Sequence, residues 1–143
     1  MHKVVEAFTA PKPVGIYPHA RQVGELLFLS GIGPRSATDN SIPGNIYDKD
    51  NKLINYDIAA QCHAVFANVL AVLEASGSSW TNLVDVTVYL TQMENDFPIY
   101  NRIWAEYFPD SSKAPCRTTL GITALPTAIA IELKCIATLE LPK

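Results

Sequence analysis

The chain has 143 residues, of which 48% are hydrophobic and 17% charged, and its net charge is −3. This length and composition fit one folded domain over residues 1–143 and argue against disorder. The negative charge argues against a nucleic-acid partner, and no apolar run approaches the ~20 residues of a membrane-spanning helix.

Two short strands and a long loop are predicted in the first third of the chain. Residues 4–8 form the first strand, which prolines end. Residues 26–30 form a short apolar strand that Gly31 stops. Residues 33–55 are rich in Gly, Pro, Ser, Asn and Asp and predict a long loop, which in a compact domain is usually functional or mobile.

A helix and a strand follow. Asp57 suits a helix N-cap, and Gly77 suits the position just after a helix C-terminus. Apolar residues recur between them at three- and four-residue steps, which makes one buried face: Ile58, Cys62, Val65, Phe66, Val69, Leu70 and Leu73. Over residues 84–90, apolar and polar residues then alternate, as in a strand with one buried face.

A second helix is predicted to begin at Asn95 or Asp96, with Pro98 in its first turn. Its inner stripe contains Ile99, Ile103, Tyr107 and Phe108. The economical packing of these elements is an α+β fold with two helices on one face of a mixed sheet.

The last part of the chain predicts two strands joined by a Leu-Pro turn at residues 125–126. Because side chains alternate between the faces of a strand, Arg117, Thr119 and Gly121 share one face. If the strands pair as a hairpin, Glu132 falls opposite Thr119, with Arg117 one step along. A guanidinium, a hydroxyl and a carboxylate would then converge on a patch suited to an organic acid that water attacks.

Arg117 and Glu132 are the strongest candidate site residues. An arginine holds a carboxylate with two parallel hydrogen bonds, a geometry that lysine cannot reproduce. A carboxylate within an apolar strand must be paired, or its pKa rises, which suits a general base or a water-positioning group. The alternative is an ion pair between the two residues, or a structural pairing of Glu132 with Lys134 at a subunit contact.

Other residues give weaker signals. Tyr17 lies in a turn-like stretch, Ser30 and Gly31 end a strand, and Asn101 lies in the second helix. From pattern alone, a packed loop tyrosine and a solvated helix asparagine are better interpretations than ligand contacts. No metal site is predicted, because the three histidines are isolated in the sequence. The odd cysteine count without a CxxC pair suggests reduced thiols in the cytoplasm.

Taken together, several segments resemble the Rid (YjgF) family of enamine and imine deaminases over nearly the whole chain. They are Gly15-Ile16-Tyr17-Pro18-His19-Ala20, the strand ending at Ser30-Gly31, Asn68-Val69-Leu70, Phe97-Pro98-Ile99-Tyr100-Asn101, Pro115-Cys116-Arg117, Leu125-Pro126 and Ile131-Glu132. The resemblance implies a chorismate-mutase-like fold, a homotrimer with sites at subunit contacts, and hydrolysis of 2-imino acids without a cofactor.

Site roles follow from the same resemblance. It places carboxylate binding on Arg117 and water positioning on Glu132, and it adds Tyr17, Ser30 and Asn101 as site residues. Many members carry cysteine where this chain has Thr119, and the loop at 33–55 is longer than usual.

The segment after Gly31, the long loop and the strand at 117–122 resemble 2-aminomuconate deaminase, which implies formation of 4-oxalocrotonate and ammonia in aromatic-compound degradation. Arg35 is then the candidate for the second carboxylate of that substrate. Two alternatives remain: a general 2-iminobutanoate/2-iminopropanoate deaminase, and a non-catalytic small-molecule sensor on the same scaffold.

Overall fold

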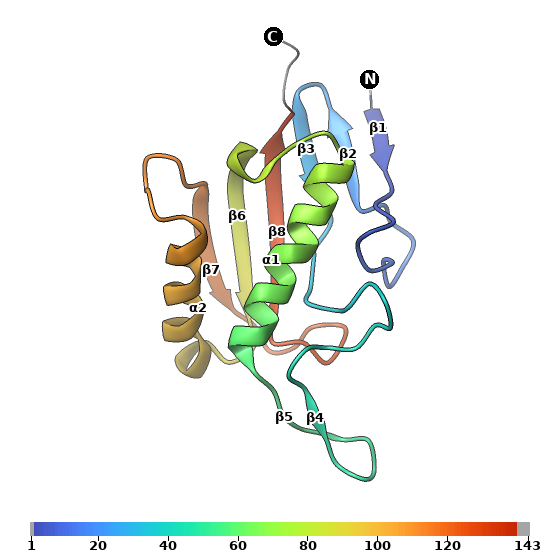
Figure 1. Cartoon of the computed structure of the whole chain (residues 1–143), viewed down its shortest axis with the longest axis vertical. Helices are drawn as coiled ribbons and strands as arrows, with labels where there is room; N and C mark the ends of the chain where they lie inside the picture. The colour runs from blue at the N-terminus through green and yellow to red at the C-terminus, as the bar shows by residue number, and fades with distance from the viewer. Residues whose placement is uncertain (1, 140–143) are drawn as a thin grey trace.

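The computed structural model describes residues 2–139 and has two layers, a six-stranded sheet and a pair of helices (Figure 1). The strand order in the sheet is β1-β2-β3-β8-β6-β7, and a separate pair, β4-β5, forms a small hairpin. In chain order the elements are β1 (His2–Val5), β2 (Ala20–Val23), β3 (Leu26–Leu29), β4 (Ile46–Tyr47), β5 (Leu53–Asn55), α1 (Ile58–Ala75), the 3-10 turn η1 (Trp80–Asn82), β6 (Leu83–Leu90), α2 (Met93–Tyr107), β7 (Cys116–Gly121) and β8 (Ile131–Thr138).

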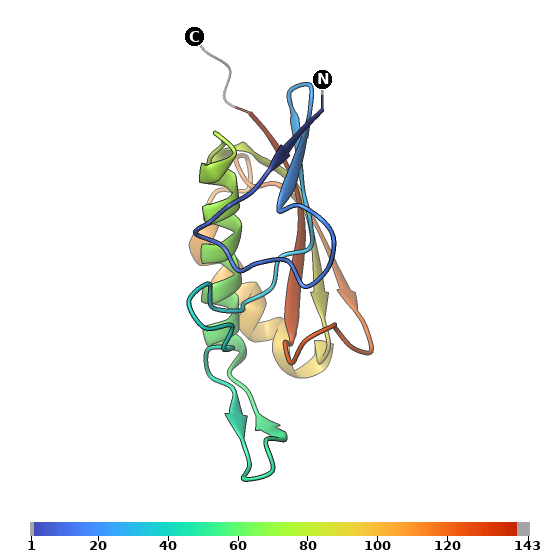
Figure 2. The ribbon, with the colours of Figure 1, turned by 90° about the vertical axis from the view of Figure 1, so that its right-hand side faces the viewer.

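Both helices cover the same face of the sheet, and Figure 2 shows the other face bare. The predicted fold class, an α+β chorismate-mutase-like arrangement with two helices on one face of a mixed sheet, is confirmed. In β8 every second side chain from Ile131 to Ala137 is buried, so Glu132 and Lys134 lie on the bare face. That face therefore carries the charged positions of the central strand.

Helix α1 supplies the other half of the core. Asp57 caps it as predicted, since its carboxylate accepts a hydrogen bond from the Ala60 amide, and Gly77 adopts the left-handed conformation expected after a helix. The helix is long and apolar enough to cross a membrane by composition, contrary to the sequence prediction. Its inner face is fully buried, as in the core helix of a folded domain.

The predicted hairpin between the last two strands is wrong. β6 lies between β7 and β8, pairs antiparallel with β8 and pairs parallel with β7. The reason is the crossover: α2 carries the chain from the end of β6 back to the start of β7, so the two strands run in the same direction. The turn at residues 125–126 belongs instead to the segment that passes beyond β6 to reach β8.

Several element boundaries also differ from the predictions. The first strand ends at Val5, and the strand Ala20–Val23 and the small hairpin in the 33–55 loop were not predicted. α2 begins at Met93, with Gln92 as its N-cap, which places Pro98 inside the helix. Asp96 is not a cap: it is buried, and its carboxylate accepts a 2.7 Å hydrogen bond from the Tyr56 hydroxyl.

Candidate functional site

Arg117 lies on the edge strand β7 and points toward α2, where three aromatic rings surround its guanidinium. Its central carbon is 5.0 Å from the ring centroid of Trp104, 5.3 Å from Tyr100 and 6.0 Å from Phe97. Rings at these distances attract a cation through their negative faces. Helical spacing of three and four residues puts the three rings on one side of α2. The aromatic side chains therefore hold Arg117 in place.

The positive charge of Arg117 has no neutralising partner in residues 2–139. No carboxylate in that part of the chain lies within 4.0 Å of the guanidinium, and the contact found at that range joins His19 Nδ1 to the Glu6 carboxylate at 3.9 Å. The alternative of an intrachain ion pair between Arg117 and Glu132 is therefore wrong. An arginine that is positioned by rings and left unpaired keeps its N–H donors for an anion.

Thr119 lies next to Arg117 on β7, and Asn101 is next in sequence to Tyr100 on α2. Thr119 is two residues further along the same face of β7, and its hydroxyl oxygen is 3.4 Å from that of Tyr100. Asn101 follows Tyr100 on the exposed surface of α2. An open pocket next to them is lined by Met93, Glu94, Phe97, Pro98 and Thr119. We call Arg117, Thr119 and Asn101 the arginine group.

Glu132 lies half-buried on the bare face of β8, against the backbone of Gly31. A Cβ atom built on Gly31 would approach the Glu132 Oε2 atom to 2.9 Å, so a larger residue at this position would displace the carboxylate from where it now lies. Two backbone hydrogen bonds of 2.9 Å between Ile32 and Leu133 fix the two segments side by side. Burial raises the pKa of the Glu132 carboxyl above its ordinary value, as expected for a proton-accepting group.

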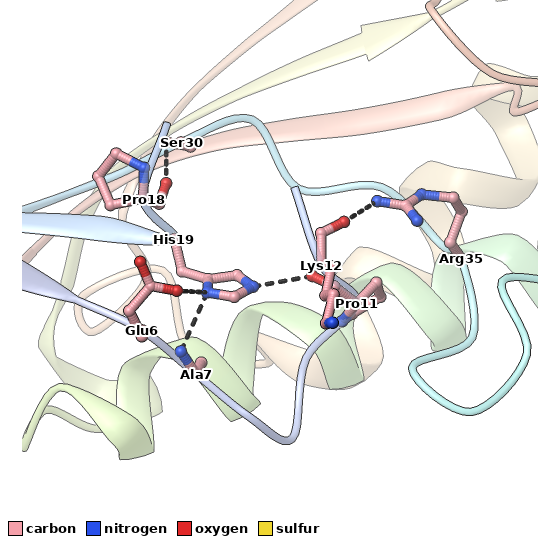
Figure 3. Close-up of polar contacts among 8 residues, drawn as sticks. All are labelled: Glu6, Ala7, Pro11, Lys12, Pro18, His19, Ser30 and Arg35. Carbon is pink, nitrogen blue, oxygen red and sulfur yellow. Dashed lines mark hydrogen bonds and ion pairs between the residues drawn. The ribbon is translucent and has the colours of Figure 1, made fainter. Parts of the chain in front are cut away.

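Tyr17, Ser30, Gly31 and Arg35 line one small pocket. The Ser30 hydroxyl donates a 2.6 Å hydrogen bond to the Pro18 carbonyl and so holds the segment next to Tyr17 (Figure 3). Since Gly31 both lines this pocket and supports Glu132, these residues form a second cluster. We call Glu132 together with Tyr17, Ser30, Gly31 and Arg35 the glutamate group.

The guanidinium of Arg35 already makes two contacts. It donates a 2.6 Å hydrogen bond to the Lys12 carbonyl, visible in Figure 3, and a 2.8 Å hydrogen bond to the Asn40 side chain. On the helix side, the Asn68 amide donates to the carbonyls of Gly33 and Arg35, 2.8 Å each. Arg35 is therefore part of the framework of its loop as well as a cation at the pocket.

The two groups do not meet within one chain, which corrects the predicted convergence of Arg117 and Glu132. Arg117 faces α2, whereas Glu132 faces away from both helices, and β6 separates their strands. The glycine beneath the carboxylate is Gly31, and the predicted floor glycine, Gly121, instead approaches Met93. Within one chain, a ligand held by Arg117 on the helix side of the sheet does not face the Glu132 carboxylate.

Sequence reasoning missed the aromatic residues around Arg117. The spacing of Phe97, Tyr100 and Trp104 was a usable signal, because it marks one helical face. Burial raises the pKa of the Cys62 and Cys135 thiols to about 12, so neither is a nucleophile. In residues 2–139 no group of three potential metal ligands is present.

The geometry can be compared with known proteins. The family model described as Endoribonuclease L-PSP matches residues 7–139. A RutC family protein of Pyrococcus horikoshii is 37% identical over 96% of this chain and 98% of its own length. A 2-iminobutanoate/2-iminopropanoate deaminase of Dermatophagoides farinae is 32% identical over 96% of this chain and 97% of its own length.

Solved structures agree with the sequence comparisons. The crystal structure of E. coli TdcF with bound serine superposes with a TM-score of 0.81 at 26% identity, covering 96% of this chain and 99% of that one. The match thus extends over the sheet, both helices and both groups of candidate residues. The chain belongs to the endoribonuclease L-PSP family, which is the Rid (YjgF) family that its sequence motifs indicated.

Proposed function

We propose that this protein is a hydrolytic deaminase of 2-imino acids. The observation that carries the proposal is Arg117, a cation held by three aromatic rings and left without a carboxylate partner in the described chain. The Glu132 carboxyl, whose pKa burial raises, supplies the base. A relative named as a 2-iminobutanoate/2-iminopropanoate deaminase supports the same chemistry.

The reaction follows from these two side chains. Arg117 binds the C1 carboxylate of the imine with two hydrogen bonds and withdraws electrons from C2. Glu132 accepts a proton from a water as its oxygen attacks C2, and the C=N electron pair moves to nitrogen, which takes up a proton. In the resulting carbinolamine the hydroxyl proton passes to the amino group, the C–N bond breaks with its electron pair going to nitrogen, and ammonia leaves a 2-oxo acid behind. Positioning supplies much of the acceleration, since imines are already electrophilic.

We propose that the working unit is a homotrimer with three sites, each combining the arginine group of one copy with the glutamate group of the next. One chain alone separates Arg117 from Glu132 by the thickness of the sheet. The bare sheet face and the edge strand β7 remain available for contact, and Leu26 and Leu120 are exposed on them. Closed rings of identical chains form through such head-to-tail contacts.

The substrate class is a short 2-imino acid, and 2-aminomuconate is the alternative. The named deaminase relative acts on short imines, whereas the support for 2-aminomuconate is the sequence resemblance and the position of Arg35. Ammonia release measured on 2-iminobutanoate, generated in the assay, and on 2-aminomuconate separates the two. We expect turnover of the short imine. Absence of ammonia release above the uncatalysed rate on both substrates would remove the proposal and leave the sensor alternative.

Arg35 tests the second carboxylate. If it binds the distal end of 2-aminomuconate, Arg35→Ala should raise KM for that dicarboxylate by about ten- to a hundredfold, because a charge-assisted contact is lost. KM for 2-iminobutanoate should rise much less, because only the loop contacts of Arg35, to the Lys12 carbonyl and the Asn40 side chain, are then lost. Lys52→Ala, at the exposed tip of the β4-β5 hairpin, is the matched control. An equal rise in KM for both substrates would mean that Arg35 only holds the loop segment at Lys12 and does not bind the second carboxylate.

Two other functions fit less well. The family description names an endoribonuclease, but a chain with net charge −3 offers little attraction for the phosphates of RNA. A non-catalytic sensor would use Arg117 and not the Glu132 carboxylate.

We place the protein in the cytoplasm, because its three free cysteines fit a reducing compartment.

A further inference from the structure

His19 is buried, with 5% of its surface exposed, and both of its ring nitrogens make hydrogen bonds. The Ala7 amide donates to Nδ1 at 3.0 Å, and Nε2 lies 2.8 Å from the Pro11 carbonyl (Figure 3). Because an amide can only donate, Nδ1 must be the acceptor and the ring proton must sit on Nε2. The contacts therefore select the neutral ring in one tautomer.

These contacts hold the loop that carries Tyr17. The loop runs from the end of β1 to the start of β2, and His19 closes it by tying residues 7 and 11 to residue 19. Arg35 and Ser30 hold it further along, at the carbonyls of Lys12 and Pro18. Apolar packing anchors the first part of the loop, because Ala7 and Ala10 are buried in the core, whereas Phe8 and Ile16 are almost fully exposed. Polar tethers therefore hold the rest of the loop, which includes Tyr17.

We propose that His19 is a positioning residue that keeps Tyr17 and the rest of its loop in the substrate-binding arrangement, and that its protonation weakens substrate binding. The proposal rests on the proposed function for its kinetic readout and on the loop contacts for its structural one. Protonation would place an N–H on Nδ1 directly opposite the Ala7 N–H, and the hydrogen bond between them would be lost.

When His19 is protonated, the charged groups around it determine which hydrogen bond replaces the one from the Ala7 amide. The Glu6 carboxylate is 3.9 Å from Nδ1 and mostly exposed, so it can accept the new proton's hydrogen bond only if the ring or the chain moves. Arg35 and Tyr17 are the other ionisable side chains that line the same pocket. At low pH the hydrogen bond between Ala7 and His19, which closes the loop, is thus replaced by a hydrogen bond from His19 to the solvent-exposed Glu6 carboxylate.

Two variants separate positioning from general damage. His19→Ala removes both tethers, and we expect KM for 2-iminobutanoate to rise about tenfold, equivalent to ~1.4 kcal/mol, with kcat within about twofold of wild type. His19→Gln provides one acceptor and one donor without a titrating proton, so it should restore most of the wild-type KM. His63→Gln, on the exposed side of α1, is the matched control.

The dependence of KM on pH distinguishes the two roles, because a purely structural role of His19 would leave it unchanged. From about pH 8 to about pH 5, the range in which histidines change charge, KM should rise in the wild type and stay level in His19→Gln. The protection factor of the Ala7 amide, measured by hydrogen exchange, should fall in parallel in the wild type alone. This second readout needs no substrate, so it decides the inference even if no imine is turned over.

The same KM rise and loss of Ala7 protection in His19→Gln would overturn the proposal, as would an unchanged KM in a folded His19→Ala. If His19→Ala does not fold, the comparison between wild type and His19→Gln is sufficient.

Discussion

Replacing Arg117 by lysine should lower kcat/KM for a 2-imino acid by about a hundredfold while the protein stays folded. Lysine keeps the positive charge but cannot form two parallel hydrogen bonds to a carboxylate. Charge-assisted hydrogen bonds contribute about 1.5–3 kcal/mol, and each ~1.4 kcal/mol corresponds to a factor of ten. Lysine also stacks less well on Phe97, Tyr100 and Trp104, so its ammonium will be less well positioned.

Steady-state kinetics with a thermal unfolding scan measure both parts of this expectation. Arg102→Lys is the matched control, because Arg102 lies on the exposed side of the same helix that packs over Arg117. It should behave as wild type in both experiments. Turnover close to normal in Arg117→Lys would contradict the binding of the substrate carboxylate by two hydrogen bonds from Arg117.

Replacing Glu132 by glutamine should lower kcat by about 10²–10⁴-fold, the usual contribution of a general base, and change KM by less than about threefold. Glutamine keeps the size and polarity of the side chain next to Gly31 but accepts no proton from water. Glu74→Gln, exposed on α1, is the matched control. A raised KM with normal kcat would make Glu132 a binding or structural residue.

The pH dependence gives a second test of Glu132. The reaction needs the carboxylate, so kcat should fall as the pH drops through the pKa that burial has raised. A carboxyl with a raised folded-state pKa stabilises the fold only when protonated, and this contribution is lost as the pH rises through the folded pKa. At neutral pH, Glu132→Gln should therefore unfold no earlier than wild type. An acid limb in kcat belongs to Glu132, whereas an acid rise in KM belongs to His19.

Much of the fold could be predicted because hydrophobic spacing reports local structure. The period of the apolar residues after Asp57 gave α1, and alternation gave β6 and the buried face of β8. The alternating pattern predicted that Val84 is buried, but Val84 is exposed. A register shift at the start of β6 turns Leu83 inward instead. The predicted start of α2 was wrong because Asp96, which suits an N-cap by residue type, instead hydrogen-bonds to Tyr56 in the interior.

Strand pairing could not be predicted from the same signals. Two strands close in sequence and separated by a Leu-Pro turn favour a hairpin, but the helix between β6 and β7 determines the direction of β7. Arg117 and Glu132 were found because each is a charge on a largely apolar strand. Their position on opposite faces of the sheet depends on the order β8-β6-β7, which residue spacing does not report.

We propose that Arg117 of one copy works with Glu132 of another, and mixed trimers test this pairing directly. Arg117→Lys and Glu132→Gln chains, each with a different affinity tag, are co-expressed and purified over both tags, and light scattering should give the mass of three chains. In a ring of three, either mixture leaves one contact with both native residues, so activity should recover to about one third of wild type. Mixed trimers as inactive as either parent would contradict a site shared between copies.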